Sequence, residues 1–329
     1  MTSKMINLDD YFVCKLVDMG EIDNPNFHGV YSPEPEVGRK REGVNAAFLE
    51  DAEEYYVKHQ GYDYWNQLFA GAFRRLKLSN PDLIVEYGCG FGNSTLPLLA
   101  LMPDAKVIAS DISPNLLAIG RRLVEERGYS DRCAFVAMDA QVDYIRPDIA
   151  DVVVGSAILH HLAEPRLLLT AAMRVLKPNG CAIFFEPFEI GYALIRMLLL
   201  DILNEASRRD YTSPIVDWMT QLQEALAVQI QRDRAPGWRD RDDKWIFSRN
   251  YLQDIADDVG AELIIYPLET SSGKFRSQIK YMLTVDAGFK DSDMPDWGWS
   301  IIDRLDNDIF SPDLMPDLLI AGAVIFKKR

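Results

Sequence analysis

The chain has 329 residues, of which 48% are hydrophobic and 26% charged, and its formal net charge is −15. This is an ordinary globular composition with ample apolar material for a core, and the length fits one large domain with an insertion or two smaller domains. A nucleic-acid partner is disfavoured because a duplex is itself densely negative. The best basic cluster, residues 231–244, alternates its basic side chains with aspartates that cancel most of their charge.

The cysteines are widely separated: Cys14, Cys89, Cys133 and Cys181. Their spacing argues against a metal cage or a disulfide framework and suits a reducing cytoplasm. The N-terminal segment has no apolar region of the kind that a signal peptide needs. The most apolar stretch, residues 190–203, contains Arg196 and Asp201 and is too short to span a bilayer. We therefore expect a cytoplasmic protein with no membrane span and no metal centre.

The first half of the chain predicts an α/β core. Residues 1–45 are polar and rich in turn formers, which predicts an irregular N-terminal arm, and the following residues to 76 have a helical, aromatic pattern. Within residues 46–187, helix-length amphipathic segments alternate with short apolar runs at 83–87, 106–110, 133–137, 152–155 and 181–186. This alternation predicts a doubly wound, mostly parallel, seven-stranded sheet of the Rossmann-like type. Ligand sites in such sheets lie beyond the carboxyl ends of the strands.

The second half predicts helical insertions. Residues 188–245 contain helical segments without an obvious strand, which predicts a helical cap. Residues 246–329 complete the core with strands near 263–268 and 318–326, and they include a second helical insertion at about 270–316. The predicted organisation is therefore an α/β core with helical cap insertions.

A glycine-rich turn follows the first core strand. Glu86 is followed by Gly88, Gly90 and Gly92, and glycines at a strand-to-helix turn let the backbone approach a ligand closely. A dinucleotide fingerprint starting at Gly88 would need a third glycine at position 93, where Asn93 stands. The carboxylate of Glu86 would oppose a pyrophosphate but suits an ammonium group. The ligand that needs both an acid for its amino group and a glycine turn is S-adenosylmethionine.

Two further acidic residues follow the next strands. Asp111 ends the second strand, where a carboxylate can accept both ribose hydroxyls, although its sequence context also fits a helix cap. Asp139 follows the third strand, where a short acid can receive the adenine amino group. The order of these acids along the chain therefore fits the three parts of one cofactor.

With these motifs, the segment ILHHL at 158–162 and the loop LKPNG at 176–180, the chain resembles the class I S-adenosylmethionine-dependent methyltransferases. The resemblance covers about residues 45–187 and is strongest to the small-molecule branch of quinone and natural-product enzymes. It implies S-adenosyl-L-methionine as cofactor and S-adenosyl-L-homocysteine as product. The cofactor contacts that it implies are at Glu86, Gly88, Cys89, Gly90, Asp111, Ile112, Asp139, Ala140 and Ser156.

The acceptor side is less defined by sequence. His160 and His161 follow the fourth strand, and one of them or Glu186 is a candidate base for the acceptor proton, with packing as the alternative role. Glu186 and Glu189 follow the fifth strand, where a carboxylate can take a proton, stabilise a carbocation, hold a divalent ion or remain a solvated loop charge. Tyr56 is the aromatic residue that we expect to reach the acceptor.

The predicted function is methyl transfer to a small, largely apolar metabolite in a capped pocket. Three alternatives remain: a methyltransferase acting on a protein or polyamine, a non-catalytic nucleotide-binding module, and an NAD-dependent oxidoreductase, which Asn93 and Glu86 disfavour. A homodimer is kept as an open alternative to a monomer.

Overall fold

The computed structural model describes residues 6–39, 51–231, 234–269 and 272–329. It divides into two compact units: the first holds the described residues up to Phe185 together with Leu252–Ile264 and Val324–Arg329, and the second holds Glu186–Tyr251 and Ile265–Ala323. The part of the arm that falls at residues 40–45 lies outside the described residues.

One sheet forms the centre of the fold. Its strand order is β1-β2-β5-β4-β3-β6-β7-β9-β8. The strands are β1 (Leu16–Asp18), β2 (Val30–Pro33), β3 (Leu83–Tyr87), β4 (Lys106–Asp111), β5 (Cys133–Ala137), β6 (Ala150–Ser156), β7 (Leu176–Pro187), β8 (Ala261–Pro267) and β9 (Ala321–Lys328). The ladders from β5 through β4, β3 and β6 to β7 are parallel, and every residue of β3 and of β5 is buried. The α/β class and the mostly parallel sheet are thereby confirmed.

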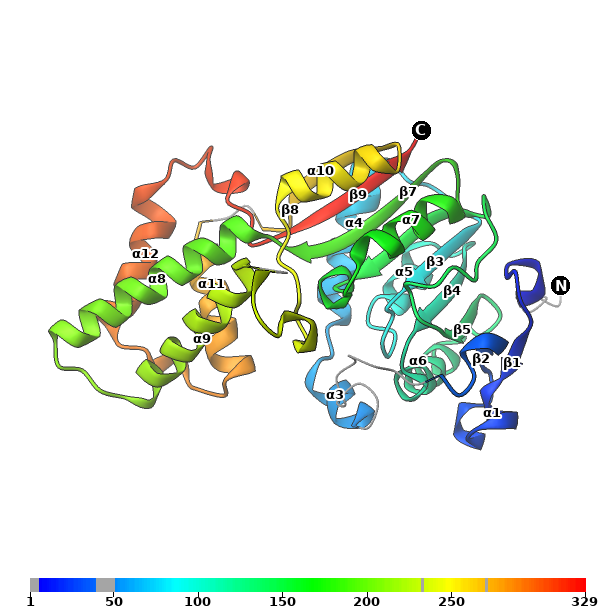
Figure 1. Cartoon of the computed structure of the whole chain (residues 1–329), viewed down its shortest axis with the longest axis horizontal. Coiled ribbons are helices and arrows are strands. Elements are labelled where there is room, and N and C mark those ends of the chain that lie inside the picture. The colour runs from blue at the N-terminus through cyan, green and yellow to red at the C-terminus, as the bar shows by residue number, and fades with distance from the viewer. Residues whose placement is uncertain (1–5, 40–50, 232–233, 270–271) are drawn as a thin grey trace. The chain divides into compact units, whose positions relative to one another are not determined.

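Helices cover the sheet of the first unit. They are α1 (Met19–Ile22), α3 (Ala52–Lys58), α4 (Tyr62–Leu76), α5 (Thr95–Leu101), α6 (Pro114–Glu126), α7 (Pro165–Val175) and α10 (Arg249–Asp258), whose last residues belong to this unit. Figure 1 shows α7 and α10 in front of the sheet and α4 behind it. A buried parallel sheet needs such cover because both of its faces are apolar.

The sheet has nine strands, so the predicted count of seven was wrong. The extra strands, β1 and β2, lie within residues 1–45, where we predicted an irregular arm. They form an antiparallel pair, and β2 then pairs in parallel with β5, placing Val30 beside Phe135. β7 begins at Leu176 rather than at 181.

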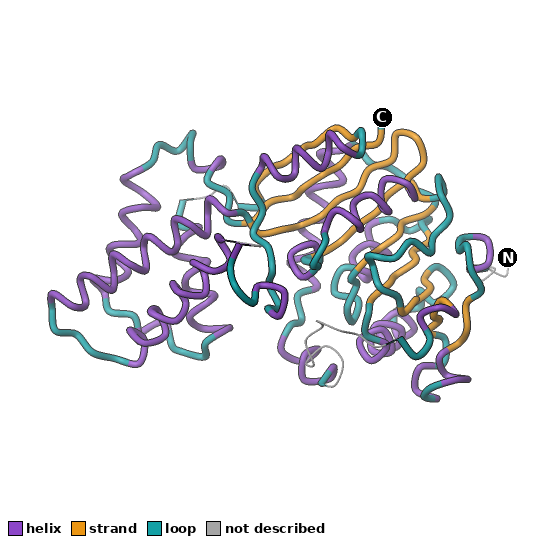
Figure 2. Tube along the Cα trace, in the orientation of Figure 1, coloured by secondary structure: helices purple, strands orange, loops and turns teal. Residues whose placement is uncertain are grey.

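The second unit is helical in its described residues apart from short strand ends. It contains α8 (Glu189–Arg208), α9 (Pro214–Gln231), α11 (Lys274–Tyr281) and α12 (Asp296–Arg304), drawn as purple coils in Figure 2. Ile202, Ile215 and Phe275 belong to one buried apolar cluster that joins these helices. Lys274 is almost fully buried, and its ammonium group donates to the backbone carbonyl of Leu318 at 2.7 Å. This unit therefore has an apolar core of its own.

No helix in the described part of the chain combines the length and the apolar character that crossing a membrane requires.

Candidate functional site

The glycine turn leaves open space beside its backbone. Gly88, Gly90 and Gly92 all have positive φ angles, of 67°, 53° and 92°. A Cβ on Gly88 would lie 2.5 Å from the Ile158 side chain, so this glycine is needed for packing. A Cβ on Gly90 would meet no atom within 4 Å. The turn is therefore packed against protein atoms at Gly88 and has free space beside Gly90. Such space is what the close approach of a ligand requires.

Glu86 is entirely buried beneath this turn. The hydroxyls of Ser94 and Thr95 donate to its two carboxylate oxygens, with a distance of 2.6 Å for Thr95. Burial raises the pKa of the Glu86 carboxyl to about 7, and these hydrogen bonds oppose the shift. The observed contacts make Glu86 a support for the start of α5, and direct contact with a ligand ammonium group stays a prediction.

Asp111 connects the turn to the end of β4. Its Oδ2 accepts the backbone N–H of Gly90 at 2.8 Å, and its Oδ1 accepts that of Ser113 at 2.9 Å. Burial raises the pKa of the Asp111 carboxyl, while backbone hydrogen bonds and the nearby His161 charge act in the opposite direction. The cap of α6 is Ser113, whose Oγ accepts the N–H of Leu116 at 3.3 Å. Asp111 is therefore not the cap residue and is held against the glycine turn.

The ends of β5 and β6 carry the next predicted residues. Asp139 accepts the backbone N–H of Gln141 at 2.9 Å, and its other oxygen lies 4.0 Å from the guanidinium of Arg39. Ser156 ends β6, and its Oγ is buried without a hydrogen-bond partner among the described residues. The next residue, Ala157, has a φ of 57°, a strained conformation of the kind that clusters at functional sites. An orphaned buried hydroxyl beside a strained residue is an expected feature of a ligand site.

His160 and His161 form a short helical turn after β6. Their ring centroids are 4.1 Å apart, and both side chains are partly exposed. His161 lies near enough to Asp111 to lower its pKa. Glu186 is buried near the end of β7, and Glu189 is the first residue of α8. Because both glutamates belong to the second unit, their grouping with the histidines stays a prediction.

The remaining predicted residues lie around the turn. Cys89 is buried, and burial raises the pKa of its thiol well above the usual value. Ala140 is buried after β5, and Ile112 is partly exposed after β4. Tyr56, on α3, packs edge-on against Phe91 with ring centroids 5.1 Å apart. The structure therefore brings an aromatic residue of α3 to the glycine turn.

Sequence reasoning missed three side chains at this site. Ser94 and Thr95 hold Glu86, and Asn93 bonds to the segment between α3 and α4. In the sequence, Asn93 stands out only because it occupies the place of a third glycine. The spacing along the chain gives no signal for its role, because its partners are 32 and 34 residues away.

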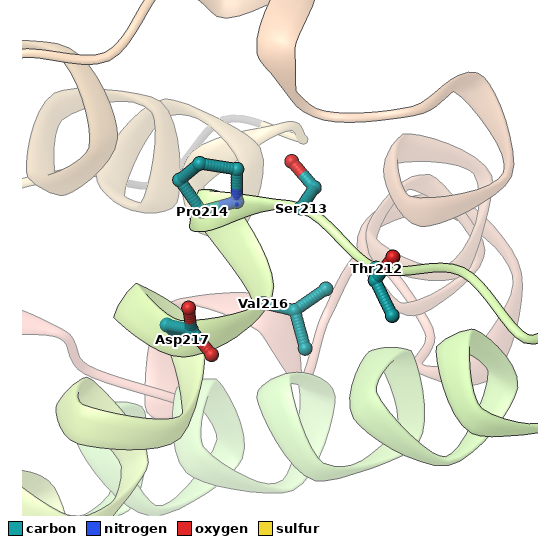
Figure 3. A pocket seen from close by; sticks show the side chains of 5 residues that line it. All are labelled: Thr212, Ser213, Pro214, Val216 and Asp217. Carbon is teal, nitrogen blue, oxygen red and sulfur yellow. The ribbon is translucent and has the colours of Figure 1, made fainter.

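Two surface hollows lie elsewhere. One, of about 390 Å³, is lined by residues around the start of α9, which Figure 3 shows as Thr212, Ser213, Pro214, Val216 and Asp217. The other, of about 580 Å³, lies in the first unit and is lined by residues of α3 and α6 with Asn24, Asn26 and Phe27. Neither contains a predicted site residue.

The residues present fit S-adenosylmethionine. The open side of Gly90 gives space for a ligand beside the backbone, and the orphaned hydroxyl of Ser156 offers an unused hydrogen-bonding group. Asp111 and Asp139 follow neighbouring parallel strands, so they share the carboxyl edge of the sheet. The fold and this site are those expected of a class I, S-adenosylmethionine-dependent methyltransferase domain.

Comparison with known proteins shows similarity to methyltransferases. Residues 84–180 match the family model described as a methyltransferase domain. The chain is 35% identical over 114 residues to a trans-aconitate 2-methyltransferase of Methylobacterium nodulans, covering 34% of this chain and 41% of that protein. It is 32% identical over 166 residues to a demethylmenaquinone methyltransferase of Symbiobacterium thermophilum, covering 48% and 63%. The chain thus matches less than two thirds of the length of these relatives.

A solved structure supports the fold. The complex between the Haloferax volcanii Trm112 methyltransferase activator and the putative methyltransferase contains a chain that matches with a TM-score of 0.50 and 14% identity. The match covers 88% of this chain and 99% of that one. This likeness shows the fold alone, and the methyltransferase prediction is supported by the family match over residues 84–180.

Proposed function

We propose that the whole chain is an enzyme that transfers the methyl group of S-adenosylmethionine to a small, largely apolar metabolite. The observation that carries this proposal is the pairing of an open glycine turn at Gly90 with the unpartnered hydroxyl of Ser156. A purely structural strand-to-helix turn needs neither feature. Relatives named for trans-aconitate and demethylmenaquinone support a small acceptor.

Each end of the cofactor has a proposed set of partners. Gly88, Cys89 and Gly90 surround the methionine end with Ser156, and Glu86 provides the negative charge beneath the turn. Asp111 and Ile112 hold the ribose. Asp139 and Ala140 meet the adenine. Each carboxylate oxygen of Asp111 already accepts one backbone N–H. The ribose hydroxyls would therefore donate to the remaining lone pair of each oxygen.

The bound cofactor supplies an electrophilic methyl group on a sulfonium that needs no protonation when it leaves. The chain's own contribution is to align the acceptor with that methyl group and to exclude water. His161, with His160 and Glu186 as the other candidates, takes the proton of an acceptor hydroxyl or carbon acid. A histidine suits this role because an imidazole titrates near neutral pH.

Tyr56 and Glu189 are the residues proposed to bind the acceptor. Tyr56 lies on α3 and packs against Phe91 of the glycine turn. A protein or polyamine acceptor and a non-catalytic nucleotide-binding role are the alternatives. Action in the cytoplasm, as a monomer or homodimer, is consistent with the four free cysteines.

Calorimetric titration separates these proposals. S-adenosylmethionine and S-adenosylhomocysteine should bind in the micromolar range, about −8 kcal/mol, and NAD should not bind. Methyl transfer to trans-aconitate or a demethylmenaquinone analogue would then distinguish an enzyme from a binding module. Binding of NAD in place of both sulfur compounds would overturn the proposal.

A further inference from the structure

The side chain of Asn93 joins the glycine turn to the junction between two helices. Its Oδ1 accepts the backbone N–H of Gly61 at 2.9 Å, and its Nδ2 donates to the backbone carbonyl of His59 at 2.7 Å. His59 is the C-cap residue that follows α3, and Gly61 precedes the first residue of α4. Backbone groups at helix ends lack partners within their own helix. One amide therefore satisfies the end of one helix and the start of the next.

A second contact starts from the same turn. The Phe91 ring packs edge-on against Tyr55 and Tyr56, with centroid distances of 6.0 Å and 5.1 Å. Phe91 is buried in a cluster with Ala52 of α3 and with Leu116 and Ile119 of α6. Phe91 and Asn93 flank Gly92 in the chain. A shift of the backbone at the glycine turn would therefore move both the Phe91 ring and the Asn93 amide, which contact α3 and the residues that follow it.

One face of α3 is aromatic, since Tyr55 and Tyr56 both contact Phe91. Burial lowers the pKa of His59, whose ring lies 4.4 Å from that of Tyr55 between centroids. A neutral imidazole beside the phenol ring of Tyr55 favours an aromatic or apolar surface over a charged one.

We propose that Asn93 is a positioning residue that transmits occupancy of the cofactor turn to α3, so that cofactor binding orders the helix that carries Tyr56. This inference rests on the proposed function, since it requires the cofactor to lie on the glycine turn. The inference adds that the acceptor binds after the cofactor. The reason is that α3, which carries Tyr56, is fully ordered only when the cofactor occupies the glycine turn. If Asn93 only stabilised the fold, it would instead hold α3 equally with and without ligand.

Hydrogen exchange of the amides in residues 52–61 tests this, with and without S-adenosylhomocysteine. In the natural protein, saturating ligand should slow exchange there by about fivefold or more, the lower range of measured coupling between sites. Asn93→Ala should abolish this ligand-dependent change while the ligand still binds within about tenfold of the natural affinity. Asn93→Asp keeps the acceptor for Gly61 but loses the donor to His59, so an intermediate change is expected. It also provides the test if the alanine variant does not fold.

Arg132→Ala is the matched control. Its guanidinium donates to the backbone carbonyls of Leu99, Met102 and Ala105 at 3.1–3.2 Å, so it fastens the same unit away from α3. This variant should lower the melting temperature yet keep the ligand-dependent protection of residues 52–61. Wild-type protection in Asn93→Ala, or ligand binding that leaves residues 52–61 unchanged in the natural protein, would overturn the coupling alone. Absence of ligand binding to the natural protein would overturn the proposed function.

Discussion

The Tyr144 hydroxyl donates a hydrogen bond of 2.6 Å to the buried carboxylate of Glu36, which is 108 residues earlier in the chain. Arg39 donates to the same oxygen at 2.6 Å, and its guanidinium also lies 4.0 Å from Asp139. Burial and the Glu36 carboxylate together raise the pKa of Tyr144 to about 12. The N-terminal strands are therefore tied to the loop that follows Asp139, at the predicted adenine end of the site.

Loss of this bond should destabilise the fold measurably. Tyr144→Phe removes this donor from the buried Glu36 carboxylate, and a hydrogen bond to a charged group contributes about 1.5–3 kcal/mol. We expect a decrease of that size in the free energy of unfolding, measured by urea denaturation at pH 7. Tyr129→Phe is the control, because its ring stacks beneath Arg132 without relying on a buried acceptor. Equal stability of the two variants would contradict the role of Glu36.

The buried Glu86 should make the ligand-free protein less stable as pH rises. Its folded pKa of about 7 lies above the ordinary 4.5, so between these values the folded protein retains a proton that the unfolded chain releases. Stability from this group is complete below pH 4.5, and about 3 kcal/mol of it is lost as pH rises to 7. Glu86→Gln, which stays neutral, should flatten that part of the curve. Thermal or urea unfolding at several pH values measures the difference, and parallel curves for the two proteins would disprove the assignment.

The open side of Gly90 should be sensitive to any added side chain. Gly90→Ala strains a backbone with φ of 53°, at about 1–2 kcal/mol, and also fills the space proposed for the ligand. Gly128→Ala has the same kind of strain, with φ of 73° and no atom within 4 Å of the new Cβ, but it lies away from the turn. Both variants should lose similar stability, and only Gly90→Ala should weaken S-adenosylhomocysteine binding. Calorimetry that shows equal affinity for the two variants would place the ligand elsewhere.

Asp111 should affect cofactor affinity, unlike the neighbouring cap residue Ser113. Asp111→Ala removes the carboxylate proposed to hold the ribose and should weaken both S-adenosylmethionine and S-adenosylhomocysteine by about tenfold or more, as expected for lost hydrogen bonds to a charged group. Ser113→Ala removes the cap of α6, costs about 1 kcal/mol of stability and should leave affinity unchanged. If calorimetry gives Asp111→Ala the natural affinity, Asp111 does not belong to the cofactor site.

The catalytic proposal predicts a loss of rate without a loss of cofactor. His161→Ala or Glu186→Gln should lower single-turnover methylation by about 10²–10⁴-fold, the usual contribution of a general base. His28→Ala serves as the control, because that histidine is 76% exposed and pairs with Asp18 in the N-terminal segment. Trans-aconitate and a demethylmenaquinone analogue are the acceptors to use, with cofactor affinity measured alongside. If both variants bind cofactor and react at the natural rate, the enzyme works by positioning alone.

The local sequence determined the core strands and the turn. The strand predicted at 83–87 is β3 with the same bounds, because its apolar run ends at a glycine turn whose conformation is set within a few residues. The same local logic placed Asp111 and Asp139 at the ends of β4 and β5. The alternation of strands and helices up to β7 likewise depends on short-range patterns that are complete in the sequence.

Only the tertiary structure decided which distant segments meet. β2 pairs with β5, which lies about a hundred residues later in the chain. β1 has three residues, too few to show the alternation of apolar and polar side chains by which a strand is predicted. The amide of Asn93 reaches His59, and the hydroxyl of Ser156 is left without a partner, only because the sheet and helices pack as they do. Such contacts depend on long-range packing and not on neighbouring residues, so they cannot be predicted from local sequence propensity.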